Sequence, residues 1–310
     1  MKQALAVLLL LLAASCASSK GDAHYCDLFA FTTAPPEVQP ARDRIRLAVI
    51  GDAGDAAERQ NPEVQPRALA EAIASQGPFD AILVLGDNFY PCGITRENAA
   101  EQFALVYAPL FALNIPVFPV LGNHDYGDGG KCAGRKVEPE AQVEHPGWRM
   151  PARNYVVRWP GLATIAMFDS EPVKLQCSGS DAVIGFVRDA LTTSTDEWKL
   201  VAGHHVVESS GPHGRQPNDG GRMRALLAPI LEQADADLYL SGHDHHLEIS
   251  RTRKPAYVVS GAASRLRRPY GGDAYRRHGF AIVELTPEKM TISLIELHSR
   301  KLLHAITVDR

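Results

Sequence analysis

The 310-residue sequence predicts an α/β fold in which two mixed β-sheets pack together with helices on the outside. Three observations predict this class. Apolar strand-like runs alternate with helix-like segments early in the chain, as in parallel sheets with helical crossovers. Two apolar runs separated by Pro160-Gly161 indicate a hairpin. Closely spaced apolar runs without helices between them end the chain, which indicates antiparallel strands.

The elements of the first half follow from hydrophobic periodicity. The expected strands are Ile45–Ile50, Ala81–Leu85 and Val117–Leu121. One crossover helix places five apolar residues on one face, namely Val64, Ala68, Leu69, Ala72 and Ile73. That helix stops before Gly77-Pro78, and the next one runs from about Glu97 to Tyr107. Residues 127–153 are polar and lack periodicity, so we expect an insertion there.

The second half adds strands and two further helices. The expected helices are Asp181–Leu191 and an amphipathic segment with Met223, Leu226, Leu227, Ile230 and Leu231. The expected strands are Tyr155–Trp159, Ala163–Phe168, Trp198–Ala202, Leu238–Leu240, Tyr257–Ser260, Phe280–Leu285, Met290–Leu297 and Leu302–Val308. No linker or repeat divides residues 45–310, so we expect a single domain over that range.

The N-terminus has the features of a secretory signal over residues 1–17. A basic start precedes an apolar core from Leu5 to Ala14, which is too short to span a bilayer as a mature helix. Cys16 follows small residues, as in a bacterial lipoprotein signal, while cleavage after Ala17 is the alternative. A buried N-terminal helix is a third interpretation. Residues 18–44 are polar and read as a tether.

Export of the chain permits disulfides, and if Cys16 is removed or lipidated, four of the five cysteines remain, for which three pairings exist. Cys92 and Cys132 each follow a candidate metal loop, which favours that pair and leaves Cys26 with Cys177. We expect a periplasmic, outer-membrane-anchored or secreted bacterial protein that contacts membranes only through a lipid anchor. The formal net charge of −4 gives no reason to expect nucleic-acid binding.

Five predicted strands end on residue types that bind metals. A single Gly-Asp after a strand is usually a plain turn, and a single Gly-His is usually structural. Five such ends in one chain instead predict a shared site, because strand ends of an α/β sheet meet at one edge. The oxygen and imidazole donors, without thiolates, suit hard or borderline metals. They are Asp52, Asp87, Tyr90, Asn123, His204, His243 and His245. Seven ligands are too many for one metal ion, but they match two metal ions that share one carboxylate.

These motifs resemble those of the binuclear metallophosphoesterases, a four-layer sandwich family, and within it the purple acid phosphatases (the tartrate-resistant branch). The matching motifs are Gly-Asp-Ala-Gly (51–54), Gly-Asp-Asn-Phe-Tyr (86–90), Gly-Asn-His-Asp (122–125), Val-Ala-Gly-His-His (201–205) and Gly-His-Asp-His (242–245). Most metallophosphoesterases have a histidine ligand where this chain has Gly54. Tyr90 supplies a replacement donor, and a phenolate fits a ferric ion.

The resemblance implies two metal ions. Fe(III) would take Asp52, Asp87, Tyr90 and His245, and a divalent Fe, Zn or Mn would take Asp87, Asn123, His204 and His243. His124 resembles the family's phosphate-orienting histidine, and His213 the histidine that protonates the leaving group. Asp125 and Asp244 read as orienters of metal ligands, whereas His205 and His246 match no ligand position.

The implied function is an exported acid phosphatase that hydrolyses phosphomonoesters, small molecules or phosphoproteins, by attack of a metal-activated hydroxide on phosphorus. We expect a monomer. A phosphodiesterase or pyrophosphatase on the same metals is one alternative, and a non-catalytic surface lipoprotein is another. Five arginines crowd a loop after the Tyr257 strand and are interpreted as a solvated basic loop, with anion binding as the alternative. They are Arg265, Arg267, Arg268, Arg276 and Arg277.

Overall fold

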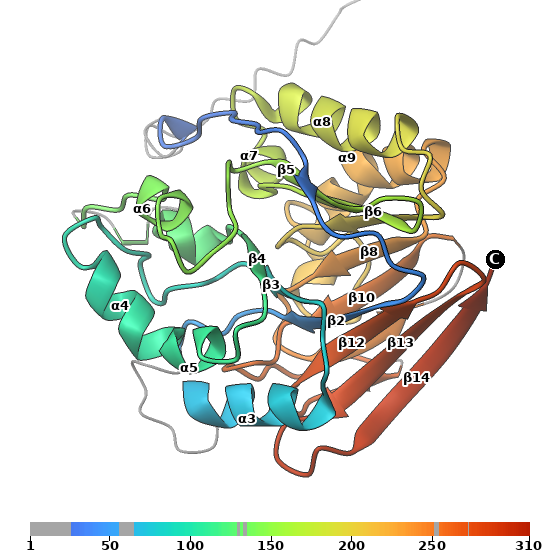
Figure 1. Cartoon of the computed structure of the whole chain (residues 1–310). Coiled ribbons are helices and arrows are strands. Elements are labelled where there is room, and N and C mark those ends of the chain that lie inside the picture. Colours follow the sequence, from blue (N-terminus) through green and yellow to red (C-terminus); the bar gives the residue numbers. More distant parts are fainter. Residues whose placement is uncertain (1–25, 56–64, 129–130, 133–134, 251–253, 272) are drawn as a thin grey trace, which may run out of the picture.

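The computed structural model describes residues 26–55, 65–128, 131–132, 135–250, 254–271 and 273–310. The predicted signal over residues 1–17, with Cys16, and the helix residue Val64 lie outside the described residues. Two β-sheets pack against each other with helices outside, so the predicted fold class is confirmed (Figure 1). In the described part of the chain no helix is both long enough and apolar enough to cross a bilayer.

The six-stranded sheet has the order β14–β13–β12–β2–β3–β4. Its strands are β2 (Ile45–Ile50), β3 (Ala81–Leu85), β4 (Val117–Val120), β12 (Gly279–Leu285), β13 (Lys289–Glu296) and β14 (Leu302–Asp309). The first three pair in parallel and the last three antiparallel, as predicted. Strands β2 and β3 are almost wholly buried, which is why they read as continuous apolar runs.

The eight-stranded sheet has the order β1–β5–β6–β7–β8–β10–β9–β11. Its strands are β1 (Glu37–Val38), β5 (Tyr155–Trp159), β6 (Ala163–Met167), β7 (Trp198–Ala202), β8 (Leu238–Ser241), β9 (Leu247–Ser250), β10 (Ala256–Ser260) and β11 (Ala274–Tyr275). The hairpin of β5 and β6 is confirmed. The purely antiparallel pairing expected for β10 is wrong, because β10 pairs in parallel with β8 and antiparallel with β9, which was not predicted.

Helices close the fold on both outer sides (Figure 1). They are α3 (Pro66–Gln76), α4 (Ala99–Val106), α5 (Ala108–Phe111), α6 (Glu140–Val143), α7 (Glu171–Leu175), α8 (Ser180–Thr192) and α9 (Gly220–Gln233). Successive side chains of a strand point to opposite faces of the sheet, so the hydrophobic core has two parts, one on each face. Leu200 of β7 joins the large cluster shared by the two sheets, whereas its neighbour Val201 packs with residues of α8 and α9.

Residues 26–44, predicted as part of a tether, are built into the domain instead. Cys26 forms a disulfide with Cys177, and β1 adds a strand parallel to β5. A second disulfide joins Cys92 to Cys132, so the favoured pairing is present. The segment is polar because it lies at a sheet edge, and its attachment depends on partners more than 100 residues away.

The predicted insertion over residues 127–153 is only partly a surface loop. It contains α6, and Trp148 packs against Phe103 with ring centroids 5.0 Å apart. A buried guanidinium on Arg153 anchors its end by contacting the Tyr126 hydroxyl and Glu140. These contacts make most of the segment part of the wall beside the strand ends.

Candidate metal centre

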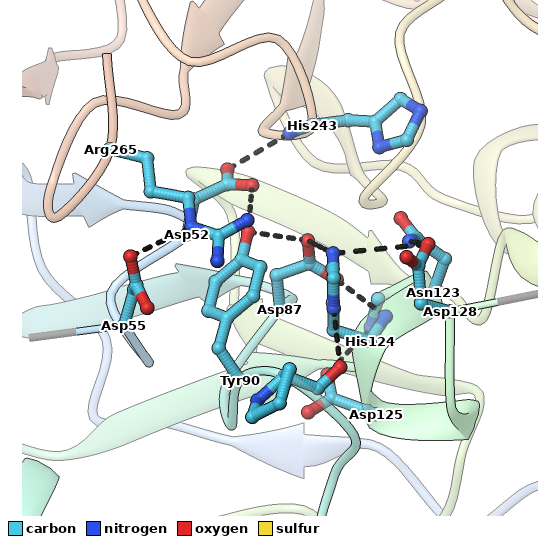
Figure 2. Close-up of polar contacts among 12 residues, drawn as sticks. Asp52, Asp55, Asp87, Tyr90, Asn123, His124, Asp125, Asp128, His243 and Arg265 are labelled. Carbon is cyan, nitrogen blue, oxygen red and sulfur yellow. Dashed lines mark hydrogen bonds and ion pairs between the residues drawn. The ribbon is translucent and has the colours of Figure 1, made fainter. Parts of the chain in front are cut away.

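The structure brings all seven candidate metal-binding side chains together. Asp52 follows β2, Asp87 follows β3 and Asn123 follows β4 in one sheet. His204 follows β7 in the other sheet, and the loop after β8 carries both His243 and His245. The carboxyl ends of these parallel strands meet at one edge, as α/β sheets require. Figure 2 shows several of these residues facing one another.

The backbone of three of these loops adopts an uncommon conformation. The φ angles of Asp52, Asp87 and His243 are 57°, 54° and 66°, in the left-handed region that side chains with a Cβ seldom occupy. Non-glycine residues in strained positions cluster at functional sites, where the surrounding fold holds them. Glycines let the loops approach: a Cβ on Gly122 would lie 2.3 Å from the Asp87 nitrogen, and one on Gly242 2.5 Å from Asp52 Oδ2.

One half of the centre is an acidic cluster around Tyr90. The Tyr90 hydroxyl lies 2.6 Å from Asp87 Oδ2 and 3.0 Å from Asp52 Oδ1 (Figure 2). His245 Nε2 lies 3.2 Å from the same Asp52 oxygen and 3.4 Å from the hydroxyl. Burial, together with Asp52 and Asp87, raises the pKa of Tyr90 well above 10. One hydroxyl proton thus serves two buried carboxylates, and a cation would replace it favourably.

The other half of the centre is a cluster of lone pairs. His204 Nδ1 lies 2.8 Å from the Leu85 carbonyl and donates to it, so in the neutral ring that binds a metal Nε2 presents its lone pair. His243 Nε2 lies 3.0 Å from Asp219 Oδ2, which leaves its Nδ1 unprotonated. These two bare nitrogens are 3.1 Å apart. Each atom offers electrons and neither offers a proton.

The side chain of Asn123 completes this second group. Its Nδ2 donates to Asp128 Oδ1 at 2.8 Å, so its Oδ1 is the atom that lies 3.1 Å from His204 Nε2. Three lone pairs therefore converge, and only a cation, or a molecule that donates to all three, satisfies them. An amide oxygen with two imidazole nitrogens suits a borderline divalent ion. The donor set fits the metal pair that the sequence predicts.

Asp87 lies between the two groups. Its Oδ2 faces Tyr90, and its Oδ1 lies 3.4 Å from His204 Nε2 and accepts the His124 amide at 2.9 Å. Burial alone would raise the pKa of Asp87, but His204, His124 and the Tyr90 hydroxyl together hold it well below its usual range. A carboxylate that stays ionised and presents one oxygen to each group can bridge two ions.

His124 projects its ring over this centre from the loop after β4 (Figure 2). Its Nδ1 lies 2.6 Å from the Pro91 carbonyl and therefore carries a proton. Its Nε2 lies 3.9 Å from both Asp87 Oδ2 and Asp128 Oδ1, beyond hydrogen-bond distance. Nε2 is the ring atom left to interact with a bound molecule.

His213 lies beside the second group, and Asp219 connects the two. The ring centroids of His213 and His243 are 3.8 Å apart. Asp219 Oδ2 accepts from His213 Nδ1 at 2.8 Å and from His243 Nε2 at 3.0 Å. The sequence analysis missed Asp219, because it precedes helix α9 and follows no strand. Its only sequence signal is an acid just before an amphipathic helix, which also fits a helix cap.

His205 is adjacent to His204 but has no lone pair to offer. Its Nε2 lies 2.9 Å from Glu171, and its Nδ1 lies 2.8 Å from the Ser170 hydroxyl, which donates to it. Ser170 Oγ also accepts the backbone amides of His204 and His205 at 3.1 Å each. Ser170 and Glu171 thus hold the His204 loop, a role that the sequence did not reveal.

Two further aspartates hold the loops of the centre. Asp125 accepts the backbone amides of Asn88, Phe89 and Gly122 at 2.8–3.1 Å and so supports the loop between Asp87 and Tyr90. Asp244 accepts from Ser209 Oγ at 2.6 Å and from the amides of His213 and Gly214 at 3.1 Å. Asp244 therefore contacts the loop that carries His213, and not a metal-ligand side chain as expected.

A cavity of about 250 Å³ opens above the centre and is lined by candidate ligands, by both histidines and by basic residues. Arg265 Nε pairs with Asp55 at 2.8 Å, and its guanidinium lies 3.8 Å from the Tyr90 ring centroid. Arg267 Nη1 lies 2.6 Å from His213 Nε2. The interpretation of this arginine loop as merely solvated is wrong for Arg265, whereas Arg267 is exposed and contacts His213.

Comparison with known proteins agrees with this geometry. The chain belongs to the calcineurin-like phosphoesterase family, whose model matches residues 45–247. It is 27% identical to tartrate-resistant acid phosphatase type 5 of Sus scrofa, over 83% of this chain and 85% of that protein. It is 30% identical to purple acid phosphatase 17 of Arabidopsis thaliana, over 74% of this chain and 71% of that protein. The chain is thus a phosphoesterase of the purple acid phosphatase type, a family with a binuclear metal centre.

Solved structures share the fold at low identity. GAP50, described as the anchor in the inner membrane complex of Plasmodium, matches with a TM-score of 0.69 and 18% identity, over 86% of this chain and 89% of that chain. The purple acid phosphatase PPD1 from yellow lupin (Lupinus luteus) seeds matches with a TM-score of 0.66 and 16% identity, over 89% of this chain and 55% of that chain. The resemblance to purple acid phosphatases expected from the sequence is confirmed.

Proposed function

We propose that this chain hydrolyses phosphomonoesters at a centre of Fe(III) and a divalent Fe, Zn or Mn. The observation that supports this proposal best is the convergence of metal-ligand side chains in two adjacent groups. One group contains a phenol and two carboxylates, which suit a ferric ion, and the other contains two imidazoles and an amide. Asp52, Tyr90 and His245 would hold the ferric ion, Asn123, His204 and His243 the divalent ion, and Asp87 would bridge.

When bound, the metal pair would supply Lewis-acid charge for the phosphoryl oxygens and an activated water as nucleophile. The chain's own residues do the remaining work. His124 Nε2 faces the cavity and, in the imidazolium form, can donate to a phosphoryl oxygen while Nδ1 donates to the Pro91 carbonyl. In its imidazolium form His213 can hand its Nε2 proton to the departing alkoxide, while Asp219 accepts from Nδ1 and keeps the ring oriented.

The visible spectrum and the metal content of purified protein test this proposal. We expect about two metal ions per chain, one of them iron, and a violet phenolate-to-iron absorption band. Tyr90→Phe removes the phenolate and should abolish the band. Phe89→Tyr, which adds a buried phenol at the adjacent position, is a control and should leave the band in place. A colourless, active protein loaded with zinc or manganese alone would contradict the ferric assignment.

A substrate comparison tests the reaction type. Hydrolysis of p-nitrophenyl phosphate should exceed that of bis(p-nitrophenyl) phosphate, because a monoester presents three free oxygens to the metals and His124. A preference for the diester would contradict a phosphomonoesterase and favour a phosphodiesterase.

We also propose that the protein is exported through the segment at residues 1–17. The two disulfides support this, because disulfides persist in oxidising compartments. Mass spectrometry of the mature N-terminus separates the two processing alternatives: an acylated Cys16 indicates a lipoprotein, and a free N-terminus after Ala17 indicates ordinary cleavage. A cytoplasmic protein that retains Met1 would contradict export.

A further inference from the structure

Four basic side chains from three segments line the cavity above the metal centre. They are Lys131, Lys174, Arg265 and Arg267. Two of them are paired with acids: Lys131 Nζ lies 3.0 Å from Asp128, and Arg265 lies 2.8 Å from Asp55. Among the described residues, neither Lys174 nor Arg267 forms an ion pair with a carboxylate. The cavity therefore holds two cations without a salt bridge, of which Lys174 lies close enough to Glu171 to help lower the pKa of that carboxyl.

The fold holds Arg267 in place over the site. Its backbone amide donates to the His245 carbonyl at 2.7 Å. Three residues further on, the Tyr270 amide donates to the Ser210 carbonyl at 3.0 Å, which joins the arginine loop to the His213 loop. Ser264, at the start of the same loop, contacts the Asp52 carbonyl. The guanidinium uses one N–H on His213 Nε2 and has four more, so it can bind an anion as well.

Lys174 approaches the cavity from another direction. It lies on α7, whose first residue Glu171 pairs with His205 beside the metal loop. The Lys174 amide donates to the Ser170 carbonyl, and Arg222 donates to the Lys174 carbonyl at 2.8 Å. The backbone that carries the ammonium group is therefore fixed relative to His204. Lys174 and Arg267 lie on different elements, and both line the space next to the metal donors.

The carboxylates that line the cavity are already engaged. Asp87 belongs to the metal donors, Asp128 receives Lys131 and Asn123, and Asp219 receives two imidazoles. The volume of about 250 Å³ lies just below the usual range of roughly 300–1,000 Å³ for small-molecule sites. The cavity suits a compact leaving group.

We propose that Lys174 and Arg267 form an anion subsite beside the metal pair, selecting small phosphomonoesters whose leaving group carries a second negative charge, carboxylate or phosphate. This inference rests on the phosphomonoesterase function proposed above. Charge-assisted hydrogen bonds from a guanidinium and an ammonium would hold the second anion. Arg267 would then turn from His213 Nε2 to the substrate, and the His213 imidazolium would donate its Nε2 proton to the same leaving group.

The test compares substrates with and without the second charge. At fixed ionic strength, kcat/KM is measured for glycerol 2-phosphate, whose leaving group is uncharged, and for 3-phosphoglycerate and pyrophosphate, whose leaving groups are charged. The preference is the kcat/KM of a substrate with a charged leaving group divided by the kcat/KM of glycerol 2-phosphate. We expect Arg267→Gln and Lys174→Gln each to lower that ratio about tenfold, the effect of losing one partly exposed charge-assisted hydrogen bond. The comparison of 3-phosphoglycerate with pyrophosphate distinguishes a carboxylate from a phosphate.

Arg268→Gln is the matched control, because it removes the same charge one residue away and Arg268 does not line the cavity. Its ratio should stay within about twofold of the wild-type ratio. A wild-type enzyme with no preference for the charged substrates, or an Arg267→Gln variant with an unchanged ratio, would overturn the subsite. An equal loss of the ratio in Arg268→Gln would overturn it too, since overall charge would then explain the preference.

Failure of the proposed function has a different signature. In that case the metal-loaded wild-type protein would not hydrolyse even p-nitrophenyl phosphate. Calorimetric titration with pyrophosphate then tests the subsite alone. A loss of about tenfold in affinity in Arg267→Gln, with Arg268→Gln unaffected, supports the subsite, and equal affinities overturn it.

Discussion

The two ends of strand β7 carry buried polar clusters of opposite character. Before the strand, Asp196 accepts from Arg158 Nε and Thr164 Oγ1 on Oδ2 at 2.6 Å each. Its Oδ1 accepts from Arg158 Nη2 at 2.9 Å and from the Gly161 amide at 2.7 Å. Every acceptor at this end has donors, and the cluster fastens the β5–β6 hairpin to β7.

After the strand, His204 lies in a cluster where acceptors face acceptors. Its Nε2 lies 3.1–3.4 Å from three acceptor atoms, Asn123 Oδ1, His243 Nδ1 and Asp87 Oδ1. Asp196 and His204 are both buried, so the burial of these residues does not distinguish the two ends. The balance of donors and acceptors does: a satisfied cluster stabilises the fold, and an acceptor-rich one requires a cation.

Substitution of the bridging carboxylate should have the largest effect. Asp87→Asn replaces one oxygen with an N–H₂ group that faces either Tyr90 or His204, so one of the two groups loses its shared ligand. We expect the metal content to fall from two ions to one or fewer, and kcat/KM to fall at least about 10³-fold, or about 4 kcal/mol. Elemental analysis and p-nitrophenyl phosphate turnover measure both. An Asp87→Asn protein that still binds two metal ions tightly would contradict the inference that the cluster after β7 holds two ions through a shared carboxylate.

Substitution of Asp219 should have an intermediate effect, because this residue shares features with both the satisfied cluster and the acceptor-rich cluster. It accepts hydrogen bonds, yet the histidine it holds presents a bare nitrogen to the metal group. Removing a carboxylate behind a ligating histidine typically costs 10–100-fold in metal affinity. We expect Asp219→Asn to lose about that factor for the divalent ion in competition with a chelator. Asn218→Ala, an exposed neighbour, is the control.

The same variant should also separate the two histidines that Asp219 contacts. Loss of His213 orientation weakens protonation of the leaving group, so an alkyl phosphate should lose more activity than p-nitrophenyl phosphate, whose phenolate needs little protonation. Equal losses on both substrates at saturating metal would leave metal binding as the only role of Asp219. Unchanged metal affinity would refute its role behind His243.

The sequence predicted the strands best where both faces are buried. Strands β2 and β3 read directly as apolar runs with sharp ends. Strand β9 was missed because Glu248 interrupts it, and that acid is buried only because His246 and Ser210 hydrogen-bond to it. Residues 26–44 look like a tether because their stability comes from a disulfide and a strand pairing with distant partners.

The candidate site shows the same division. Asp52, Asp87 and His204 could be selected because each directly follows an apolar strand, and parallel strand ends must meet. Asp219 and Glu171 could not, because they start helices and reach the centre only through tertiary packing. Arg265 and Arg267 were visible as charges, but their direction depends on Asp55 and on the His245 backbone. Residue type locates ligands at strand ends, whereas the residues that orient them depend on contacts far apart in sequence.

The smallest effect on catalysis should come from the satisfied end of β7. Asp196→Asn turns one acceptor into a donor that faces Arg158 or the Gly161 amide, so we expect a loss of about 2 kcal/mol in unfolding free energy at neutral pH. Metal content and kcat/KM should stay at wild-type values. Asp189→Asn, which removes an exposed ion pair with Arg188, should cost at most about 1 kcal/mol and serves as the control.

The pH dependence of that loss tests its cause. Burial opposes ionisation of Asp196, but hydrogen bonds from Arg158, Thr164 and Gly161 lower its pKa below the ordinary 3.8. A group with a lowered pKa in the folded state contributes its full stability above the unfolded value and loses it as the pH falls through the folded value. The difference between wild type and Asp196→Asn in urea unfolding should therefore be constant above pH about 5 and shrink below pH about 4. If the variant instead lost metal, or if the difference did not depend on pH, the two ends of β7 would not differ in the way their hydrogen bonds indicate.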